Sequence, residues 1–474
     1  MLSSSSRFLL RVTLLAVILR LVPVFLTRGL GIGLDDMFQY DMLARSIVHG
    51  NGYRWYAQAD LAQLAPYVKF DLSSTGYDPE RGVPTSFRAP LYPAFLALVY
   101  ALSGTGLARF LAARLAQAIL LGAPLAPLTY LAGRRLLPDD DRAARLASIA
   151  VAVYPMLLLF PIGLGTENLF FLLLLLSFLF LLRCAQNSGI LNALAAGVLL
   201  GLTALTRSVI LPFAGLAVIW AWFALRRKRA AMLILLGLAV TITPWIVRNS
   251  LLYGKVTGIE TSLGYNLYVG YHPQSSGTFT FGPSLDLVPI LDDSLRDQLG
   301  TTRAIGFIRA DPGRVVPLAI SRLGHFFRLE LRVLTYFYSN NFFGYIPLPL
   351  LLILALIFAL PFAILSISAA FGAAWLPRAP GVLLLGLLSA AYLLPHVLIL
   401  SEERFHLALV PFFALVAGKW WSASLRLPGG MRSSRASLAI AALLILNWFY
   451  QFGSEAGKYV ALLGPNGNHA GFPY

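Results

Sequence analysis

The stretch Gly163-Leu-Gly-Thr-Glu-Asn168 runs directly into Leu169-Phe-Phe-Leu-Leu-Leu-Leu-Leu-Ser-Phe-Leu-Phe-Leu-Leu182. The second part is apolar apart from Ser177, and it ends at Arg183. An apolar run of this kind, bounded by short polar breaks, is typical of a helix that crosses a lipid bilayer. The pattern recurs along the chain and predicts an all-α polytopic membrane protein.

The composition of the whole chain agrees with this interpretation. Of 474 residues, 58% are hydrophobic and only 12% are charged, and the mean hydropathy is +0.73. Soluble globular proteins carry about 25% charged residues, so a water-soluble multidomain protein is excluded. Cys184 is the only cysteine, which excludes a disulfide framework and a cysteine-rich metal or iron–sulfur site.

Eleven apolar segments are predicted to cross the bilayer as helices. The first, Phe8–Leu26, is similar to a secretory signal, but no small-x-small cleavage site follows it and Arg20 interrupts it, so we expect a retained helix. Arg11 and Arg20 are the main charges predicted within a span. The other ten segments lie near Leu107–Ala132, Leu146–Ile162, Leu169–Leu182, Leu191–Leu205, Val209–Leu225, Ala231–Val247, Phe342–Ile367, Gly381–Leu400, Phe405–Trp421 and Leu438–Phe452.

Basic residues outnumber acidic ones, 37 against 21, which gives a net charge of +16. In a membrane protein this excess has a topological cause, because basic residues collect in cytoplasmic loops. A chain threaded from a cytoplasmic N-terminus places most of them there, so the charge needs no nucleic-acid partner. We therefore expect an integral protein of a bacterial or archaeal cell (inner) membrane. The short loops on the cytoplasmic side hold Arg134, Arg135, Arg142, Arg145, Arg183, Arg226, Arg227, Lys228, Arg229, Arg378, Arg426, Arg432 and Arg435.

The same threading places two long polar stretches on the outer face, residues 28–90 and 248–336, and a short outer tail at residues 453–474. Both stretches mix aromatic, glycine, proline and apolar residues, so we expect folded caps on a single membrane domain over residues 1–474. In Met37–Val48 the apolar residues recur at three- and four-residue intervals. This spacing predicts a short helix that lies in the membrane interface.

Three acids are predicted to lie on the outer face next to the membrane, where acidic side chains are scarce. Asp35 and Asp36 precede the interfacial helix, and one of them is suited to cap its N-terminus. Glu167 lies in the polar break before Leu169, where it, Thr166 or Asn168 is suited to cap the next helix. Two adjacent carboxylates repel each other, so the pair, together with Glu167 on the same face, also favours a functional site.

Four arginines fall near helix ends on that face: Arg88, Arg207, Arg248 and Arg404. Arginines next to a membrane commonly extend toward the water without any further role. A guanidinium group also has the shape and charge to hold a phosphate. Carboxylates and arginines together describe a site for a phosphorylated lipid and for a group that must lose a proton, which is the chemistry of group transfer to a hydroxyl or amine.

Several blocks of sequence carry a resemblance to a known family. The first is Asp36-Met-Phe-Gln-Tyr40-Asp-Met-Leu-Ala44, followed by Gly50-Asn-Gly-Tyr53. Their order, spacing and predicted sidedness resemble those of the polytopic glycosyltransferases of the GT-C fold, and within it the protein O-mannosyltransferase and lipid A aminoarabinose transferase relatives. The other blocks are Arg88-Ala-Pro-Leu-Tyr-Pro93, Thr166-Glu167, Pro244-Trp-Ile-Val-Arg-Asn249, Ala304-Ile-Gly-Phe-Ile-Arg-Ala-Asp-Pro-Gly313 and Arg404-Phe405.

The resemblance implies a glycosyltransferase that uses a polyprenyl-phosphate sugar as donor and inverts the anomeric carbon. The family's first block commonly reads Asp-Glu-x-x-Tyr-x-x-x-Ala. Here Met37 replaces the Glu and an extra acid, Asp35, comes first, so register assigns the general base to Asp36 and leaves Asp35 as the alternative. The resemblance also implies that Glu167 and Asp35 orient the acceptor or a bridging ion.

The remaining roles follow from the same resemblance. The donor phosphate is expected to bind at Arg88, Arg207, Arg248 and Arg404, and the substrate pocket at Tyr40, Tyr92, Asn249 and His272. No cofactor is certain from the sequence, and a divalent metal stays open. The partners expected are a lipid-linked sugar donor, the membrane, and an acceptor that is a lipid, a protein or a polysaccharide.

Two other function classes stay open from the sequence. One is a transporter or flippase for a lipid-linked sugar, for which ionisable residues buried in mid-span are typical. The other is a non-catalytic assembly subunit derived from the enzyme fold. The three acids at helix ends favour the enzyme.

Overall fold

The computed structural model of the chain describes residues 3–72, 76–187, 189–339, 346–427 and 431–463. The described residues form helices and one ribbon of two very short strands, β1 (Arg54–Trp55) and β2 (Val83–Pro84), which pair antiparallel. The predicted all-α membrane class is confirmed.

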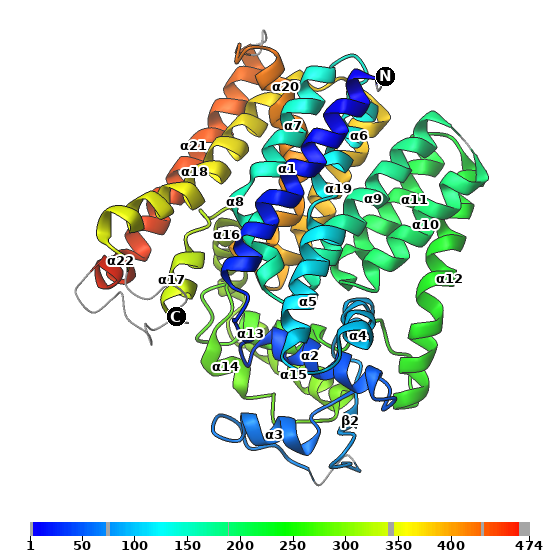
Figure 1. The fold of residues 1–474 in the computed structure, drawn as a ribbon, viewed down its shortest axis with the longest axis vertical. Helices are drawn as coiled ribbons and strands as arrows, with labels where there is room; N and C mark the ends of the chain where they lie inside the picture. The colour runs from blue at the N-terminus through cyan, green and yellow to red at the C-terminus, as the bar shows by residue number, and fades with distance from the viewer. Residues whose placement is uncertain (1–2, 73–75, 188, 340–345, 428–430, 464–474) are drawn as a thin grey trace.

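Most of the apolar helices run side by side along the long axis of the molecule (Figure 1). A π-helical turn, η1, interrupts the second long apolar helix, Ala108–Leu136. The helices of this bundle are α1 (Ser4–Leu26), α5 (Ala108–Ala116), η1 (Gln117–Gly122), α6 (Leu125–Leu136), α7 (Asp141–Val153), α8 (Pro155–Leu159), η2 (Phe160–Ile162), α9 (Thr166–Gln186), α10 (Ile190–Ala204), η3 (Ser208–Ile210), α11 (Leu211–Phe223), α12 (Lys228–Tyr253), α18 (Leu348–Gly372), η5 (Ala373–Trp375), α19 (Pro380–Leu398), η6 (Glu403–Leu409), α20 (Val410–Ser422) and α21 (Met431–Ser454).

Eight helices among the described residues are long and apolar enough to cross a membrane, or nine if the bent pair formed by α7 with α8 and η2 is one span. Each of the eleven predicted segments overlaps a helix of the bundle, although residues 342–345 of one of them lie outside the described residues. The count of eleven crossings is not confirmed, because Ile190–Ala204 and Ser208–Phe223 are shorter apolar helices. The pair is bent by 52°, at the break between Val153 and Pro155.

The most apolar run of the sequence forms the centre of the bundle. Helix α9 is largely buried, and Phe170, Leu174 and Phe178 are fully covered by neighbouring helices. Helix α10 lies against α12 at close range, since a Cβ atom on Gly197 would meet the carbonyl oxygen of Ile234 at 2.2 Å. Small residues at such crossings let helix backbones pack closely in a membrane.

The two polar stretches form a layer of short elements at one end of the bundle (Figure 1). The predicted helix at Met37–Val48 is present as α2 (Asp36–Val48). Helix α12 continues to Tyr253, past the predicted start of the second stretch at residue 248, and ends at Gly254 with a left-handed φ of 64°. The remaining elements are α3 (Gln58–Leu64), α4 (Leu91–Ser103), α13 (Leu263–Tyr271), α14 (Phe281–Leu285), α15 (Asp293–Ala310), η4 (Pro312–Arg314), α16 (Val315–Phe326) and α17 (Arg332–Ser339), with α22 (Ala456–Leu463) in the tail.

Buried ion pairs hold α2 against the bundle. The carboxylate of Asp41 is almost fully buried and accepts hydrogen bonds from Arg109 of α5 at 2.7 Å and from Tyr100 of α4 at 3.0 Å. Arg45, one turn along α2, donates to Asp41 and to Asp60 of α3, both at 2.7 Å. A buried carboxylate with several charge-assisted partners fixes the orientation of its helix, so the N-terminus of α2 has a defined place.

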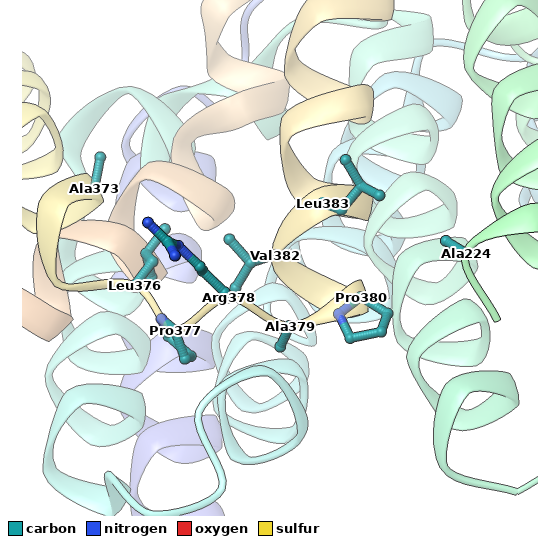
Figure 2. Close-up of a pocket in the computed structure, with 9 residues that line it drawn as sticks. All are labelled: Ala224, Ala373, Leu376, Pro377, Arg378, Ala379, Pro380, Val382 and Leu383. Atoms are coloured by element: carbon teal, nitrogen blue, oxygen red, sulfur yellow. The ribbon is translucent and has the colours of Figure 1, made fainter.

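A pocket of about 510 Å³ lies at the other end of the bundle (Figure 2). It is lined by Ala224 at the end of α11 and by residues around the start of α19, including Arg378 and Pro380. Helix α19 begins at this pocket and reaches Leu398 at its far end. Leu398 precedes the segment that carries Glu402 and Arg404, so the pocket and that segment are separated by the length of α19.

Candidate functional site

Five segments that are far apart in the sequence bring acids and arginines together at the α2 end of the bundle. Asp36 lies in the first turn of α2 and Glu167 in the first turn of α9. Arg88 lies in the segment before α4, Arg207 between α10 and η3, and Arg404 in η6. Ion pairs connect all five side chains.

The two adjacent acids at the start of α2 have different partners. Asp35 is the N-cap residue, because its carboxylate accepts a hydrogen bond from the backbone N–H of Met37 at 2.9 Å. The cap that the sequence assigns to either acid therefore falls to Asp35. The carboxylate of Asp36 pairs with Arg88, and its other oxygen lies 3.7 Å from Arg404. Gln39 accepts from Arg88 at 2.8 Å and fixes the approach of that guanidinium.

These partners move the two pKa values in opposite directions. Desolvation by the surrounding protein raises the pKa of the Asp36 carboxyl, but Arg88 and Arg404 together outweigh this effect and hold the pKa below its ordinary value. Desolvation by the surrounding protein, followed by the charge of Asp36, raises the pKa of Asp35 above its ordinary value. Asp36 is therefore the more acidic member of the pair and is ionised at neutral pH. Its side chain is 41% exposed, so a substrate can reach it.

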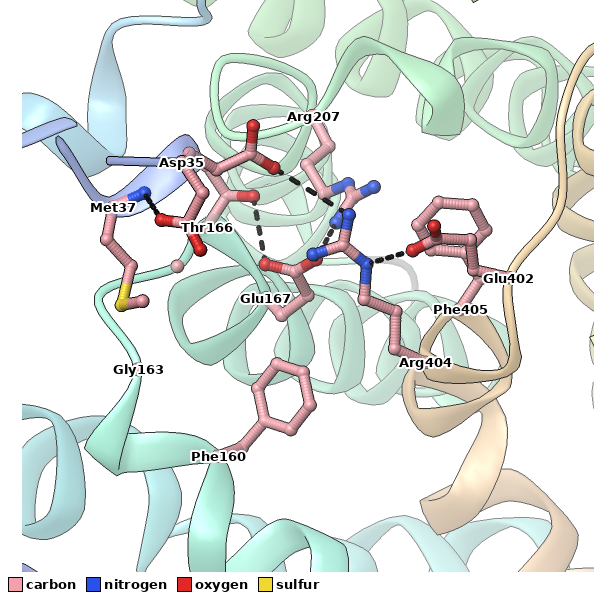
Figure 3. A network of polar contacts seen from close by, with 12 residues as sticks. Asp35, Met37, Phe160, Gly163, Thr166, Glu167, Arg207, Glu402, Arg404 and Phe405 are labelled. Carbon is pink, nitrogen blue, oxygen red and sulfur yellow. Dashed lines mark hydrogen bonds and ion pairs between the residues drawn. The ribbon is translucent and has the colours of Figure 1, made fainter. Parts of the chain in front are cut away.

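Glu167 forms the second acidic position and does not cap its helix. The N-cap residue of α9 is Gly165, which has no side chain, and Glu167 instead lies 2.7 Å from Arg207. A second guanidinium, that of Arg404, lies 3.9 Å from the same oxygen. Arg404 thus contacts both acidic positions, Asp36 and Glu167, and connects the two segments that carry them. Figure 3 shows Arg404 between Glu167 and Glu402.

The position of Arg404 depends on Glu402, a residue that the sequence does not single out. The Nε atom of Arg404 lies 2.7 Å from Glu402, whose carboxylate is 5% exposed and also pairs with Arg332 at 3.0 Å. The ring of Phe405 lies beneath the guanidinium groups of Arg207, at 5.2 Å, and Arg404, at 5.5 Å. The aromatic face and the acids together hold two cations close to each other. Two consecutive glutamates before an arginine are the sequence signal that was available for Glu402.

The segment that presents Arg88 is fixed by another acid that the sequence does not predict. Asp293, at the start of α15, is 1% exposed and accepts hydrogen bonds from the backbone N–H groups of Ser86 at 2.8 Å and Phe87 at 3.1 Å. The Tyr53 hydroxyl donates to the carbonyl oxygen of Arg88 at 2.9 Å. These contacts, from Asp293 of the second polar stretch and Tyr53 of the first, fix the backbone next to Arg88 and so set the direction of its side chain.

Arg248 does not join the cluster. It lies within α12 and donates to the carbonyl oxygens of Thr85, at 2.6 Å, and Tyr53, at 3.3 Å, while its guanidinium lies over the ring of Trp245. The sequence predicts a phosphate ligand here. In the structure Arg248 instead supports the backbone just before Arg88.

Of the four predicted pocket residues, Tyr40 and Tyr92 lie next to the cluster of acids and arginines, whereas Asn249 and His272 do not. The ring of Tyr40 lies 5.3 Å from the Arg88 guanidinium, and burial raises the pKa of its hydroxyl to about 12. Tyr92 packs against Tyr40 and donates to Gln117 at 2.6 Å. Asn249 is buried and donates to the carbonyl oxygens of Gly258 and Ile259. Within the described residues, the side chain of His272 contacts Tyr268, Phe307 and Gln274 of the second polar stretch rather than the acids.

Comparison with solved structures identifies this arrangement of helices. The oligosaccharyltransferase of Archaeoglobus fulgidus matches with a TM-score of 0.50 and 16% sequence identity in its complex with Zn and sulfate, covering 98% of this chain and 54% of that one. Its apo form matches with a TM-score of 0.50 and 15% identity, covering 99% and 57%. The chain has the GT-C fold. ArnT from Cupriavidus metallidurans bound to undecaprenyl phosphate has a TM-score of 0.42 at 14% identity, covering 98% and 82%.

The GT-C resemblance that the sequence motifs carry is thus confirmed for the fold. The chain spans slightly more than half the length of the oligosaccharyltransferase structures that it matches. No protein-family model matches the sequence, and no curated protein matches it.

A metal ion does not fit the described residues of this GT-C chain. Among them, no group of three or more His, Cys, Asp and Glu side chains is placed to hold one. The oxygens of Asp36 and Glu167 face guanidinium groups, and a divalent cation at the same oxygens would be repelled by Arg88, Arg207 and Arg404. Arginines supply the positive charge between the two acidic positions.

Proposed function

We propose that the chain is a membrane glycosyltransferase that moves a sugar from a polyprenyl-phosphate donor to a hydroxyl or amine acceptor. The observation that carries this proposal is the convergence of Arg88, Arg207 and Arg404 on Asp36 and Glu167 at one end of the bundle. Three guanidinium groups can hold a phosphate, and an ionised carboxylate beside them can take a proton.

The reaction is a single displacement at the anomeric carbon of the sugar. The carboxylate of Asp36 accepts the proton of the acceptor's O–H or N–H group, and the freed electron pair forms the new bond to the anomeric carbon. The bond from that carbon to the phosphate oxygen breaks, and its electron pair leaves on the phosphate. Arg88, Arg207 and Arg404 stabilise the departing phosphate. One displacement inverts the configuration, and no general acid is needed because a phosphate leaves readily.

The ion pairs of the site suggest how Asp36 gains basicity when the donor binds. In the described state Arg88 and Arg404 hold the pKa of Asp36 below its ordinary value. A phosphate that draws either arginine toward itself weakens this effect, so the proton affinity of Asp36 rises. Glu167 keeps Arg207 in place and orients the acceptor. Asp35 caps α2 and remains the alternative base.

The proposal includes a sidedness and a set of partners. The basic loops at the opposite end of the bundle favour a cytoplasmic location for that end. The N-terminus then lies in the cytoplasm and the site faces the outer side of the membrane. The membrane is the cell membrane of a bacterium or an archaeon. The donor is a lipid-linked sugar, and the acceptor is a lipid, a protein or a polysaccharide. Sulfate, present in the A. fulgidus oligosaccharyltransferase complex, shares the charge and shape of a phosphate group, which supports an oxyanion site.

The test uses the purified full-length chain in nanodiscs, a radiolabelled polyprenyl-phosphate sugar and a membrane extract as acceptor. We expect label to pass to the acceptor, and we expect Asp36→Asn to lower kcat by about 100- to 10,000-fold, which is the range for loss of a general base. Asp35→Asn is the matched variant, because asparagine caps a helix about as well as aspartate.

Each outcome of this test has a defined meaning. If only Asp35→Asn abolishes transfer, the base is Asp35. Wild-type rates in both variants would show that neither acid is the base. If the wild-type chain moves label across a vesicle membrane without transferring it to an acceptor, the chain is a transporter and the proposed reaction is wrong.

A further inference from the structure

Two fully buried polar residues on one helix contact the segments that carry the candidate site. Arg114 lies near the end of α5, and Gln117 begins the π-helical turn η1; both are 0% exposed. Residues three apart lie on the same side of a helix. The turn is a π-turn because Ala123 donates to the carbonyl oxygen of Ala118, five residues back, at 2.9 Å. Single π-turns within helices are frequent at functional sites.

Arg114 connects the backbone leading to Asp36 with the backbone leading to Glu167. Its guanidinium donates to the carbonyl oxygens of Leu30, at 2.6 Å, and Gly31, at 2.7 Å, in the segment before α2. Its Nε atom donates to the carbonyl oxygen of Ile162, at 2.8 Å, in the segment before α9. The first segment contains three alternating glycines, Gly29, Gly31 and Gly33, so its backbone is intrinsically flexible and depends on such contacts for order.

Gln117 extends these connections to a third segment. Its side-chain nitrogen donates to the carbonyl oxygens of Pro161, at 3.0 Å, and Gly163, at 3.2 Å. Its side-chain oxygen accepts from Asn168, next to Glu167, at 3.0 Å, and from Tyr92, at 2.6 Å. Tyr92 lies in the first turn of α4, directly after the segment that presents Arg88. The amide of Gln117 thus uses both its donor and its acceptor atom on the segments around the site.

A buried guanidinium in a membrane helix is expensive unless its contacts compensate for the loss of water. The contacts of Arg114 and Gln117 are with the backbone and with side chains next to the acids, and they span three segments of the site. We propose that Arg114 and Gln117 are positioning residues that fix the distance between the base at Asp36 and the Glu167–Arg207 pair. This inference rests on the function proposed above. A displacement of about 1 Å in such a constellation can lower a rate by about 100-fold.

The experiment measures how well the segment that carries Asp36 is fixed relative to the bundle, and it does not need the enzyme to be active. Cys184 is the only cysteine, so Cys184→Ser provides a background for two spin labels, at Leu34→Cys and Leu191→Cys. Leu34 is 45% exposed and adjoins Asp35, whereas Leu191 is 82% exposed at the start of α10 and serves as a fixed reference at the other end of the bundle. Pulsed electron paramagnetic resonance on the full chain in nanodiscs gives the distance distribution.

We expect one narrow distribution in the background chain and at least a doubling of its width in Arg114→Leu and in Gln117→Met. Arg114→Lys keeps the charge but lacks the planar fork that reaches two segments at once, so we expect it not to restore the narrow distribution. The matched control is Arg20→Leu. Arg20 is also 0% exposed and donates to backbone carbonyls, those of Ala16, Val151 and Ala152, which lie outside the three segments.

Kinetics on the unlabelled variants give the second readout. We expect kcat to fall at least about tenfold in Arg114→Lys and Gln117→Met, with the donor KM within about threefold of wild type, because the phosphate-binding arginines remain. Unchanged widths in both Arg114→Lys and Gln117→Met would overturn the inference, even if Arg114→Leu fails to fold. If the widths double but the wild-type chain transfers no sugar, the positioning inference stands and the proposed reaction fails.

Discussion

Two small groups of arginines at opposite ends of the bundle have different surroundings. At the α2 end, Arg88 and Arg207 are about four-fifths buried and each contacts an acid. At the other end, Arg226, Arg229 and Arg378 are exposed. Both sets contribute to the same net charge of +16. This contrast agrees with the proposed function, in which the exposed arginines set the orientation in the membrane and those confined among acids take part in the chemistry.

The largest expected difference between the two ends comes from matched variants, Arg404→Gln and Arg378→Gln. Arg404 contacts both Asp36 and Glu167, and we expect its loss to raise the donor KM and lower kcat/KM by about 10- to 100-fold, the range for a charge-assisted hydrogen bond to a phosphate. We expect Arg378→Gln to transfer at the wild-type rate. Steady-state kinetics with the labelled donor measure both, and equal losses in the two variants would remove the distinction between the ends.

The second prediction concerns the pH dependence of the site. Because arginine contacts hold the pKa of Asp36 below its ordinary value, the carboxylate stays ionised as the pH falls through the ordinary range for aspartate, and activity is lost only below it. In Arg88→Gln one of these contacts is gone, so the pKa of Asp36 rises and the acidic limb of the kcat/KM profile moves to higher pH. A limb that stays in place would show that a group other than Asp36 titrates there.

A smaller effect is expected at Arg248, which lies at the α2 end of the bundle but outside the cluster of acids and arginines. It contacts the backbone at Thr85 and Tyr53 rather than an acid, so its loss acts on Arg88 indirectly. We expect Arg248→Leu to lower kcat by less than about tenfold and to leave the donor Kd unchanged, since the arginines proposed to bind the phosphate remain in place. Donor binding measured by equilibrium dialysis tests this, and a loss of affinity equal to that of Arg404→Gln would return Arg248 to the phosphate site.

The sequence predicts the parts of this architecture that depend on local patterns. The apolar runs mark the bundle helices, and the spacing in Met37–Val48 marks α2. The motif register that assigns the base to Asp36 rather than Asp35 stays a prediction. The residues that order the site follow no such pattern. Asp293 acts on a segment remote in sequence, and Glu402 connects the nearby Arg404 with the distant Arg332. Arg114 lies within the predicted span Leu107–Ala132, where the apolar pattern does not indicate its contacts. Their partners are mostly backbone atoms or single side chains, and hydrophobic periodicity contains no information about such contacts.

The smallest expected effect lies at the exposed end and completes the comparison. Charge reversal at the connection between α11 and α12, by Arg226→Glu in the loop combined with Arg229→Glu in the first turn of α12, leaves the site untouched, so we expect correctly inserted protein to transfer at the wild-type rate. In the proposed topology, the same change removes part of the signal that keeps this loop in the cytoplasm. We therefore expect a larger fraction of inverted chains, measured by labelling Leu34→Cys with a membrane-impermeant thiol reagent in intact cells. If insertion is unchanged but kcat falls, the exposed arginines contribute to the chemistry, and the two ends of the bundle are not independent.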